Sequence, residues 1–369
     1  MKSELFLYGY CLVCLAILLF NIVYGVVMKQ KDQNMEQRVF YFSKLMMQQL
    51  EKIRGGEKVQ AEHLRFLERK LARVNQLIAF ERAFSAYAAE EPAMAAYHQQ
   101  LQSVILHLAR IYQNRENMQA AYFAYFVSRY RPKREPAMQE MEDILVGYMR
   151  KDSLYCRVNA LQALYVFAGE ETIVQAITLL DRENGLPHEK ILTDGLLQFE
   201  GDHARLAGLL WQSLGRFSGK TQLSILNYIR FKSGDYCEQM FAIMQSARED
   251  KELRLSAIRY FGRYHYAPAK EALLAFASDR DPLNWEYAAI AVSSLGRYDG
   301  EDVLETLVGA AHSSNWYIRQ NAAASLEAHQ LEYSELMEVL GGRDRYAREM
   351  MMYRMELQRL KSESQEAAL

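Results

Sequence analysis

Cys11 and Cys14 have the spacing C-x-x-C, which in other settings holds a metal ion or cycles between dithiol and disulfide. Both lie inside residues 5–28, a stretch without a charged residue. In such an apolar stretch the spacing is weak evidence for metal or redox chemistry, and small apolar filler is the interpretation we prefer. Cys156 and Cys237 stand alone on predicted helices, so the four cysteines do not form a disulfide scaffold.

The motifs of the common enzyme classes are absent from the sequence. We find no H-E-x-x-H, no G-x-S-x-G, no G-x-x-x-x-G-K and no G-x-G-x-x-G. The eight histidines are scattered without ligand spacing. A formal net charge of −2 also argues against a general nucleic-acid binder, which usually has a basic excess. We therefore expect no catalytic residue, no metal, no cofactor, no small-molecule substrate and no nucleic acid.

Arginine and aromatic side chains that can recognise an anionic protein segment recur in the second half of the chain. Arg supplies a fork of donors that fits a carboxylate, and Tyr supplies a rigid amphipathic face. The tentative partner-binding residues are Arg259, Arg263, Arg297, Tyr260, Tyr264, Tyr298 and Phe231. Their grouping depends on the elements that carry them.

Those elements repeat. Asn284-Trp285 is followed after six residues by Ala291 and after four more by Leu295, and the same figure returns at Asn315-Trp316. Looser versions precede it, so that the anchor position falls at Ala160, Gly195, Ile225, Ala257, Ala291 and Ala322. Few prolines, and turn signals every 10–15 residues or so, indicate short helices between these anchors. A period of about 30 residues predicts stacked helical hairpins.

The repeat resembles the HEAT-repeat family, in which a turn Asp or Asn precedes an Arg and then a helix with Ala-x-x-x-Leu. Three stretches carry the pattern: Asp152, Arg157, Ala160, Leu164; Asp250, Arg254, Ala257, Phe261; and Asn315, Arg319, Ala322, Leu326. The fifth repeat has Ala288 in place of Arg, and the second and third lack both polar markers. The resemblance covers about residues 150–345 and implies a right-handed α-solenoid of about six hairpins, with Asp/Arg pairs laddered between turns.

Helical geometry predicts which positions face away from the core. At 100° per residue, positions two and six after the anchor point nearly opposite to it. These rows contain Gln162, Leu197, Asn227, Arg259, Ser293 and Ala324, then Val166, Gly201, Phe231, Arg263, Arg297 and Ala328, with no acidic residue. The resemblance implies that this helix lines a concave groove, with the arginines near its middle. Ordinary solvated surface is the alternative reading.

Residues 5–28 are long enough to cross a membrane, since a helix of 24 residues spans about 36 Å. Lys2 precedes the stretch, whereas Lys29, Lys31, Arg38 and Lys44 follow it. The positive-inside rule then places the N-terminus outside and the C-terminal domain in the cytoplasm. A signal peptide cleaved near Val23–Gly25 is the alternative.

Between the anchor and the repeats the chain reads as helical. An amphipathic helix is expected over 33–54, and another over about 64–78, where Leu64, Leu67 and Leu71 fit either packing within the domain or a short coiled coil. The run from Arg129 to Pro136 is the best boundary signal. Its basic residues Arg129, Arg131, Lys133 and Arg134 suit a solvated connector or, alternatively, anionic headgroups.

We thus predict an all-α chain: a membrane anchor (1–32, with a transmembrane helix at about 5–28), a helical juxtamembrane domain (33–150), a HEAT-like array (151–345) and a C-terminal capping helix and tail (346–369). The predicted function is that of a non-enzymatic adaptor that binds acidic segments of proteins in a membrane-bound complex, for envelope or polysaccharide synthesis or for signalling. A HEAT-fold DNA glycosylase is the alternative, and phycobilisome lyases, which carry related repeats, are a further one.

Overall fold

The computed structural model describes residues 2–86, 92–132, 138–183, 188–331 and 336–366. Over these ranges the regular structure is helical without a strand, which confirms the all-α prediction there. Contacts divide the chain into two compact units, Met1–Gly185 (unit 1) and Leu186–Leu369 (unit 2). Residue 150, the predicted start of the repeats, therefore falls within unit 1.

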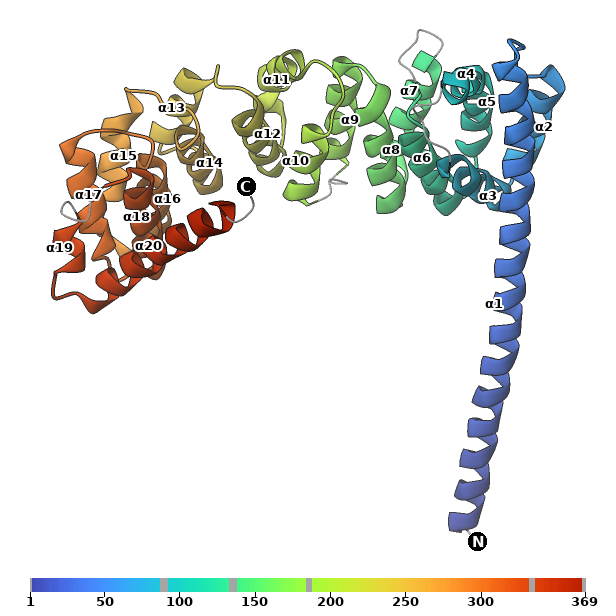
Figure 1. The fold of residues 1–369 in the computed structure, drawn as a ribbon, viewed down its shortest axis with the longest axis horizontal. Helices are drawn as coiled ribbons and strands as arrows, with labels where there is room; N and C mark the ends of the chain where they lie inside the picture. Colours follow the sequence, from blue (N-terminus) through green and yellow to red (C-terminus); the bar gives the residue numbers. More distant parts are fainter. Residues whose placement is uncertain (1, 87–91, 133–137, 184–187, 332–335, 367–369) are drawn as a thin grey trace. The chain divides into compact units, whose positions relative to one another are not determined.

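Unit 1 begins with one long helix, α1 (Lys2–Arg54), drawn in blue in Figure 1. The apolar stretch over 5–28 and the amphipathic helix over 33–54 are joined, because no Gly or Pro interrupts residues 29–32. Large apolar side chains from Leu12 to Met28 are exposed, whereas Phe42, Met46 and Leu50 are buried. Among the described residues α1 is the helix long and apolar enough to cross a membrane.

The rest of unit 1 packs in two layers. α1 lies against α3, α3 against α6 and α6 along α8, while α2, α5 and α7 back this row. α4, which packs on α1 and α5, and α9, which packs on α7 and α8, complete the unit. The bounds are α2 (Ala61–Leu71), α3 (Val74–Ser85), α4 (Pro92–Gln100), α5 (Gln102–Tyr112), α6 (Asn117–Tyr130), α7 (Gln139–Gly147), a 3₁₀ turn (Tyr148–Arg150), α8 (Leu154–Phe167) and α9 (Glu170–Arg182).

The helix predicted around 64–78 is two helices in the structure. Arg73 adopts an extended conformation (φ −101°, ψ 122°) between α2 and α3, a break that no Gly or Pro announces. α3 then continues to Ser85, beyond the predicted end at about residue 78. Leu67 and Leu71 are buried within unit 1, which supports packing inside the domain over a dimeric coiled coil.

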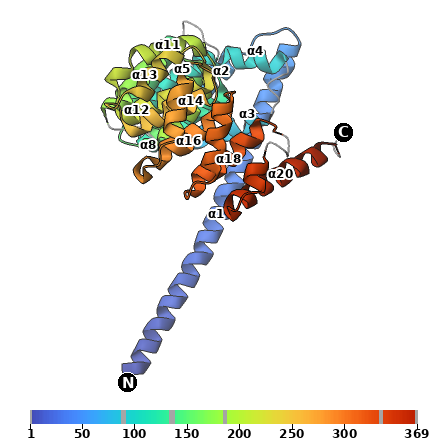
Figure 2. The ribbon, with the colours of Figure 1, turned by 90° about the vertical axis from the view of Figure 1, so that its left-hand side faces the viewer.

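Unit 2 is also two-layered. Its inner row consists of α10, α12, α14, α16, α18 and α20, and each of these helices packs on the next. The second layer, behind this row, consists of α11, α13, α15, α17 and α19 (Figures 1 and 2). The bounds are α10 (Glu189–Leu197), α11 (His203–Gln212), α12 (Gly219–Lys232), α13 (Cys237–Gln245), α14 (Lys251–Phe261), α15 (Ala269–Ala277), α16 (Trp285–Leu295), α17 (Glu301–Ala311), α18 (Trp316–Ala328), α19 (Met337–Leu340) and α20 (Arg345–Glu366).

The predicted repeat register agrees with the burial of the side chains. All six anchor positions are buried, and so are the positions four residues later, from Leu164 to Leu326. Neighbouring inner helices approach closely: the Ser294 hydroxyl donates to the Ile258 carbonyl at 2.9 Å, and that of Ser325 to the Val292 carbonyl at 2.8 Å. Small residues at this seam allow backbone-to-backbone packing, as the repeat pattern requires.

The polar residues of the repeat act differently from the expected ladder. Asn315 Oδ1 accepts from the backbone N–H of Tyr317 at 2.9 Å and so caps α18. The Arg319 guanidinium donates to the Ser313 carbonyl at 2.8 Å, within its own turn, and Arg157 binds the Lys151 carbonyl likewise at 2.9 Å. Carbonyls in the preceding turn lack helical partners, so these arginines satisfy them. Contact with the next repeat is made to aromatic rings, since the Arg254 guanidinium is 4.8 Å from the ring centroid of Tyr287 and the Arg319 guanidinium is 5.3 Å from that of Tyr346.

Candidate functional site

Four inner helices of unit 2 enclose an open hollow of about 460 Å³, which we call the arginine groove. α12, α14, α16 and α18 are adjacent, so side chains at equivalent repeat positions come together there. The lining residues are Arg230, Phe231, Arg259, Gly262, Arg263, Ile290, Ser293, Ser294, Arg297 and Asn321. Four of the seven residues predicted from the sequence are among them: Phe231, Arg259, Arg263 and Arg297.

One aromatic ring contacts two of the cations. The Arg230 guanidinium is 4.8 Å from the centroid of the Phe231 ring, and the Arg263 guanidinium is 5.4 Å from the same centroid. Arg263 is also 6.0 Å from the ring of Tyr264. These cation–π contacts hold both guanidinium groups near the groove and restrict their rotamers. Phe231 keeps 41% of its surface exposed and can still meet a ligand.

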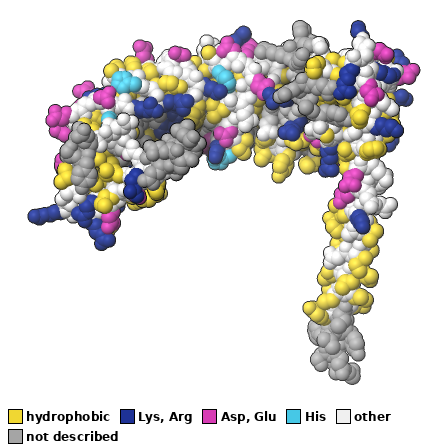
Figure 3. All heavy atoms as spheres, in the orientation of Figure 1, with side chains coloured by type: hydrophobic (Ala, Val, Ile, Leu, Met, Phe, Trp, Pro, Cys, Tyr) yellow, Lys and Arg dark blue, Asp and Glu magenta, His cyan; other side chains and the backbone are white. Residues whose placement is uncertain are grey.

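The charged side chains that line the groove are all basic. Burial lowers the pKa of Arg230, and the nearby charges of Arg259 and Arg263 lower it further. Burial also lowers the pKa of Arg259, an effect that Glu252 partly offsets. Within the described part of the chain, none of the four arginines forms an ion pair. Lys and Arg side chains gather in this region of unit 2 in Figure 3.

Clustered cations that form no ion pair among the described residues favour an anion. A carboxylate entering the groove would relieve the repulsion among the guanidinium groups and accept paired N–H donors from an arginine. Since the groove is open and spans four helices, it fits an extended segment better than a small enclosed molecule. Arg230 escaped the sequence prediction because it lies five residues after its anchor, outside the two rows considered.

Tyr260 and Tyr298 do not line the groove, which corrects the expectation that they would contact a partner. Both side chains are buried. The Tyr260 hydroxyl donates to the Ser233 carbonyl at 3.0 Å, and the Tyr298 hydroxyl accepts from the Tyr266 N–H at 3.3 Å. These hydrogen bonds connect Tyr260 of α14 to the loop after α12, and Tyr298, just after α16, to the loop after α14. Tyr264 is half-buried, with its ring 4.8 Å from that of Tyr260.

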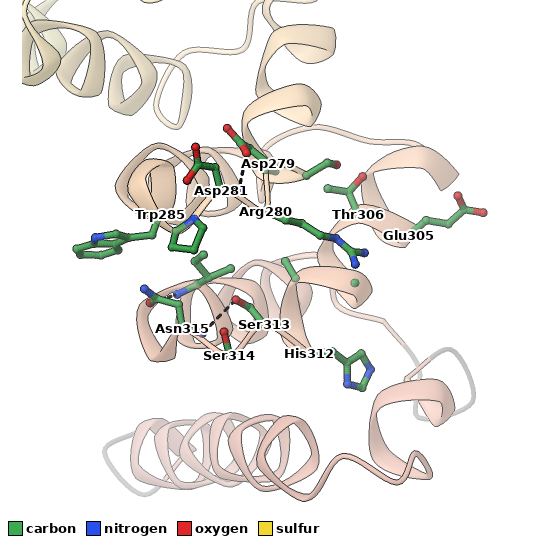
Figure 4. Close-up of a pocket in the computed structure, with 16 residues that line it drawn as sticks. Asp279, Arg280, Asp281, Trp285, Glu305, Thr306, His312, Ser313, Ser314 and Asn315 are labelled. Atoms are coloured by element: carbon green, nitrogen blue, oxygen red, sulfur yellow. Dashed lines mark hydrogen bonds between the residues drawn. The ribbon is translucent and has the colours of Figure 1, made fainter.

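A larger hollow of about 820 Å³ lies between the turn before α16 and the turn before α18 (Figure 4). Its carboxylates already serve the local turns. Asp279 accepts from the Asp281 N–H at 2.9 Å and from the Asn284 amide at 2.8 Å, while Asp281 accepts from the Leu283 N–H at 2.9 Å. Arg280 lies beside Thr306 and Glu305 in Figure 4. Acidic and basic side chains both line this hollow, whereas the charged side chains that line the arginine groove are all basic.

Among the described residues, no three His, Cys, Asp or Glu side chains stand close enough to hold a metal ion. Cys14 is exposed on α1, while the side chain of Cys11 lies outside the described part. Of the basic boundary run, Arg129 lies in the last turn of α6 and Arg131 follows the helix in a left-handed conformation (φ 53°), whereas Lys133, Arg134 and Pro136 lie outside the described residues.

The comparisons with known proteins agree with the repeat register. A family model described as HEAT repeats matches residues 238–327, which include α14, α16 and nearly all of α18. A search of the curated proteins finds no match. The matched stretch carries Arg259, Arg263 and Arg297 of the groove, and it supports the family named by the sequence pattern. Residues 238–327 of this chain are therefore similar to HEAT repeats.

Proposed function

We propose that this chain is a single-pass membrane-anchored adaptor whose HEAT repeats form a right-handed α-solenoid that binds an acidic segment of a partner protein in the arginine groove. The protein acts by binding and not by catalysis. Its N-terminus lies outside the cell membrane and the repeats lie in the cytoplasm.

The unpaired cluster of Arg230, Arg259, Arg263 and Arg297 around Phe231 carries the proposal for the groove. An acidic peptide gains charge-assisted hydrogen bonds there, and Arg and aromatic residues dominate the binding energy of many protein interfaces. HEAT repeats generally mediate protein–protein interactions.

The exposed apolar part of α1 supports the anchor. Large apolar side chains from Leu12 to Met28 are exposed, and the hydrocarbon core of a bilayer would cover them. Lys29 and Lys31 follow at once and favour the cytoplasmic side.

The intact chain, extracted in mild detergent, should capture a protein whose binding weakens as salt is raised. The variant Arg259→Glu/Arg263→Glu/Arg297→Glu should lose that protein while keeping its melting temperature. A partner retained by the variant would remove the groove from the proposal. Binding of duplex DNA at physiological salt with release of a modified base would favour the glycosylase alternative.

A further inference from the structure

We propose that one edge of unit 1 rests on the anionic headgroups of the membrane that α1 crosses. This edge, called the span-side edge, is made by the loop between α2 and α3, the loop between α5 and α6, and the turn before α8. Its exposed or half-exposed basic residues are Lys70, Arg73, Arg115, Arg150 and Lys151. The inference rests on the proposed anchoring by α1 and adds a second lipid contact to it.

Hydrogen bonds bring the three loops to the same edge. The Tyr112 hydroxyl, at the end of α5, donates to the carbonyl of Leu71, at the end of α2, at 2.8 Å. The Asn159 amide donates to the Ala121 carbonyl at 3.0 Å, and both residues lie in the second turn of their helices. Because α6 and α8 pack along each other, their first turns lie side by side.

The edge faces the apolar end of α1. Lys70 shares a small hollow with Asn34 and Gln37 of α1, whereas the Gln60 N–H, before α2 begins, donates to the Gln49 side chain at 3.1 Å. α2 therefore runs back along α1 toward the span (Figure 1). Asn34 lies six residues past Met28, a rise of about 9 Å.

That height matches the headgroup layer. Headgroups occupy about 5–7 Å outside the hydrocarbon core on each side, so extended Lys and Arg side chains from the edge reach lipid phosphates. Five basic residues stand there against two carboxylates, Glu116 and Asp152. Each Lys or Arg close to an anionic surface strengthens the attraction to it.

Apolar and aromatic side chains accompany these charges. Met118, Leu154 and Tyr155 are 66%, 48% and 70% exposed, although they lie on or next to the same loops. Tyrosine is favoured at the boundary between lipid and water. Basic and amphipathic side chains together on one edge are better suited to contact with a lipid surface than to exposure to water alone.

The other candidate for lipid contact lies at the opposite edge. Tyr130 ends α6, and its hydroxyl bonds to the His98 carbonyl, away from the start of that helix. Arg129 and Arg131 are therefore a helix length from the span-side edge, about 20 Å. We place the headgroup contact at Arg150 and Lys151 and not at this basic run.

Quenching by lipid tests the proposal on the full chain. The variant Tyr155→Trp is reconstituted in phosphatidylcholine vesicles, with or without phosphatidylglycerol, that carry a headgroup-level spin-labelled lipid. Trp fluorescence quenching is compared with that of the unsubstituted chain, whose own tryptophans are in unit 2. Lys58→Trp is the matched control, since residue 58 is exposed and precedes α2 at the far edge.

We expect position 155 to be quenched well above position 58, more strongly with phosphatidylglycerol and less at high salt. Adding Arg150→Glu/Lys151→Glu should reduce contact with the anionic surface about tenfold or more, and Lys58→Glu should not. Equal quenching at both positions, in a chain that resists carbonate extraction, would overturn the edge contact and leave the anchor intact. Equal quenching at 155 in both lipid mixtures would overturn the role of lipid charge. A chain released by carbonate would refute the anchor itself.

Discussion

The guanidinium of Arg263 lies 5.4 Å from the centroid of the Phe231 ring, although the two residues belong to different helical hairpins. The contact links α12 to the turn that follows α14, and both residues line the arginine groove. It keeps a cation and an aromatic face together at the position where we propose that a partner binds.

Replacing Phe231 with Ala tests the value of that contact. Arg230 and Arg263 would lose the ring that restrains them, at a cost of about 0.5–2 kcal/mol for cation–π contacts of this kind. Since the ring is 41% exposed, we expect weaker partner capture and little loss of stability. Phe231→Tyr, which keeps an aromatic face, is the control and should bind nearly as well.

Ala322 tests the repeat register. Its side chain is fully buried at the seam between inner helices, so Ala322→Glu places an unpaired charge in the core. The expected cost is about 3–5 kcal/mol in the free energy of unfolding. Ala328→Glu on the same helix is exposed and should cost less than about 1 kcal/mol. Similar denaturation curves for the two variants would show that the register is misassigned.

His63 predicts a pH dependence of unit 1. Its ring nitrogen is 2.8 Å from the Tyr97 hydroxyl, and burial lowers the His63 pKa from 6.5 to about 4. The unfolded chain therefore binds the proton more tightly than the folded one. The contribution of His63 to the free energy of unfolding is fully present above pH 6.5, and it falls by about 3 kcal/mol as the pH drops from 6.5 to 4. Hydrogen exchange of α2 and α4 should follow this loss, and His63→Gln should flatten it.

The topology of the anchor can be checked on intact cells. With the repeats in the cytoplasm, external protease should leave unit 2 intact until the membrane is opened. Digestion without lysis would reverse the orientation. Sequencing of the mature N-terminus decides the other alternative, because a start near Val26 would identify residues before it as a cleaved signal peptide.

Helical periodicity in the sequence predicted three of the four arginines that line the groove. Arg259, Arg263 and Arg297 fall two or six residues after buried anchors, positions that 100° per residue turns away from the core, although Arg263 and Arg297 lie in the turns just after α14 and α16. The same arithmetic explains the errors at Tyr260 and Tyr298. They lie three and seven residues after their anchors, which turns both toward the core, although each adjoins a groove arginine in the sequence.

Other features depend on tertiary contacts, which the helical periodicity of the sequence does not predict. The extended conformation at Arg73 splits α2 from α3 without a Gly or Pro. The grouping of Arg115 with Arg150 and Lys151 depends on how α6 and α8 are aligned, which the Asn159–Ala121 hydrogen bond fixes. No local pattern in the sequence relates those loops to the height of Asn34 on α1.

Crosslinking from Ser293 is the most direct test of the central claim. Ser293 is exposed in the groove, so a photoreactive residue there should attach to a partner segment rich in Asp and Glu. The same probe at Leu283, on an exposed turn outside the groove, should not. We predict that Arg259→Glu/Arg263→Glu/Arg297→Glu abolishes the Ser293 adduct in membranes. An adduct that survives these reversals, or that maps to a segment without acidic residues, would contradict the proposed function.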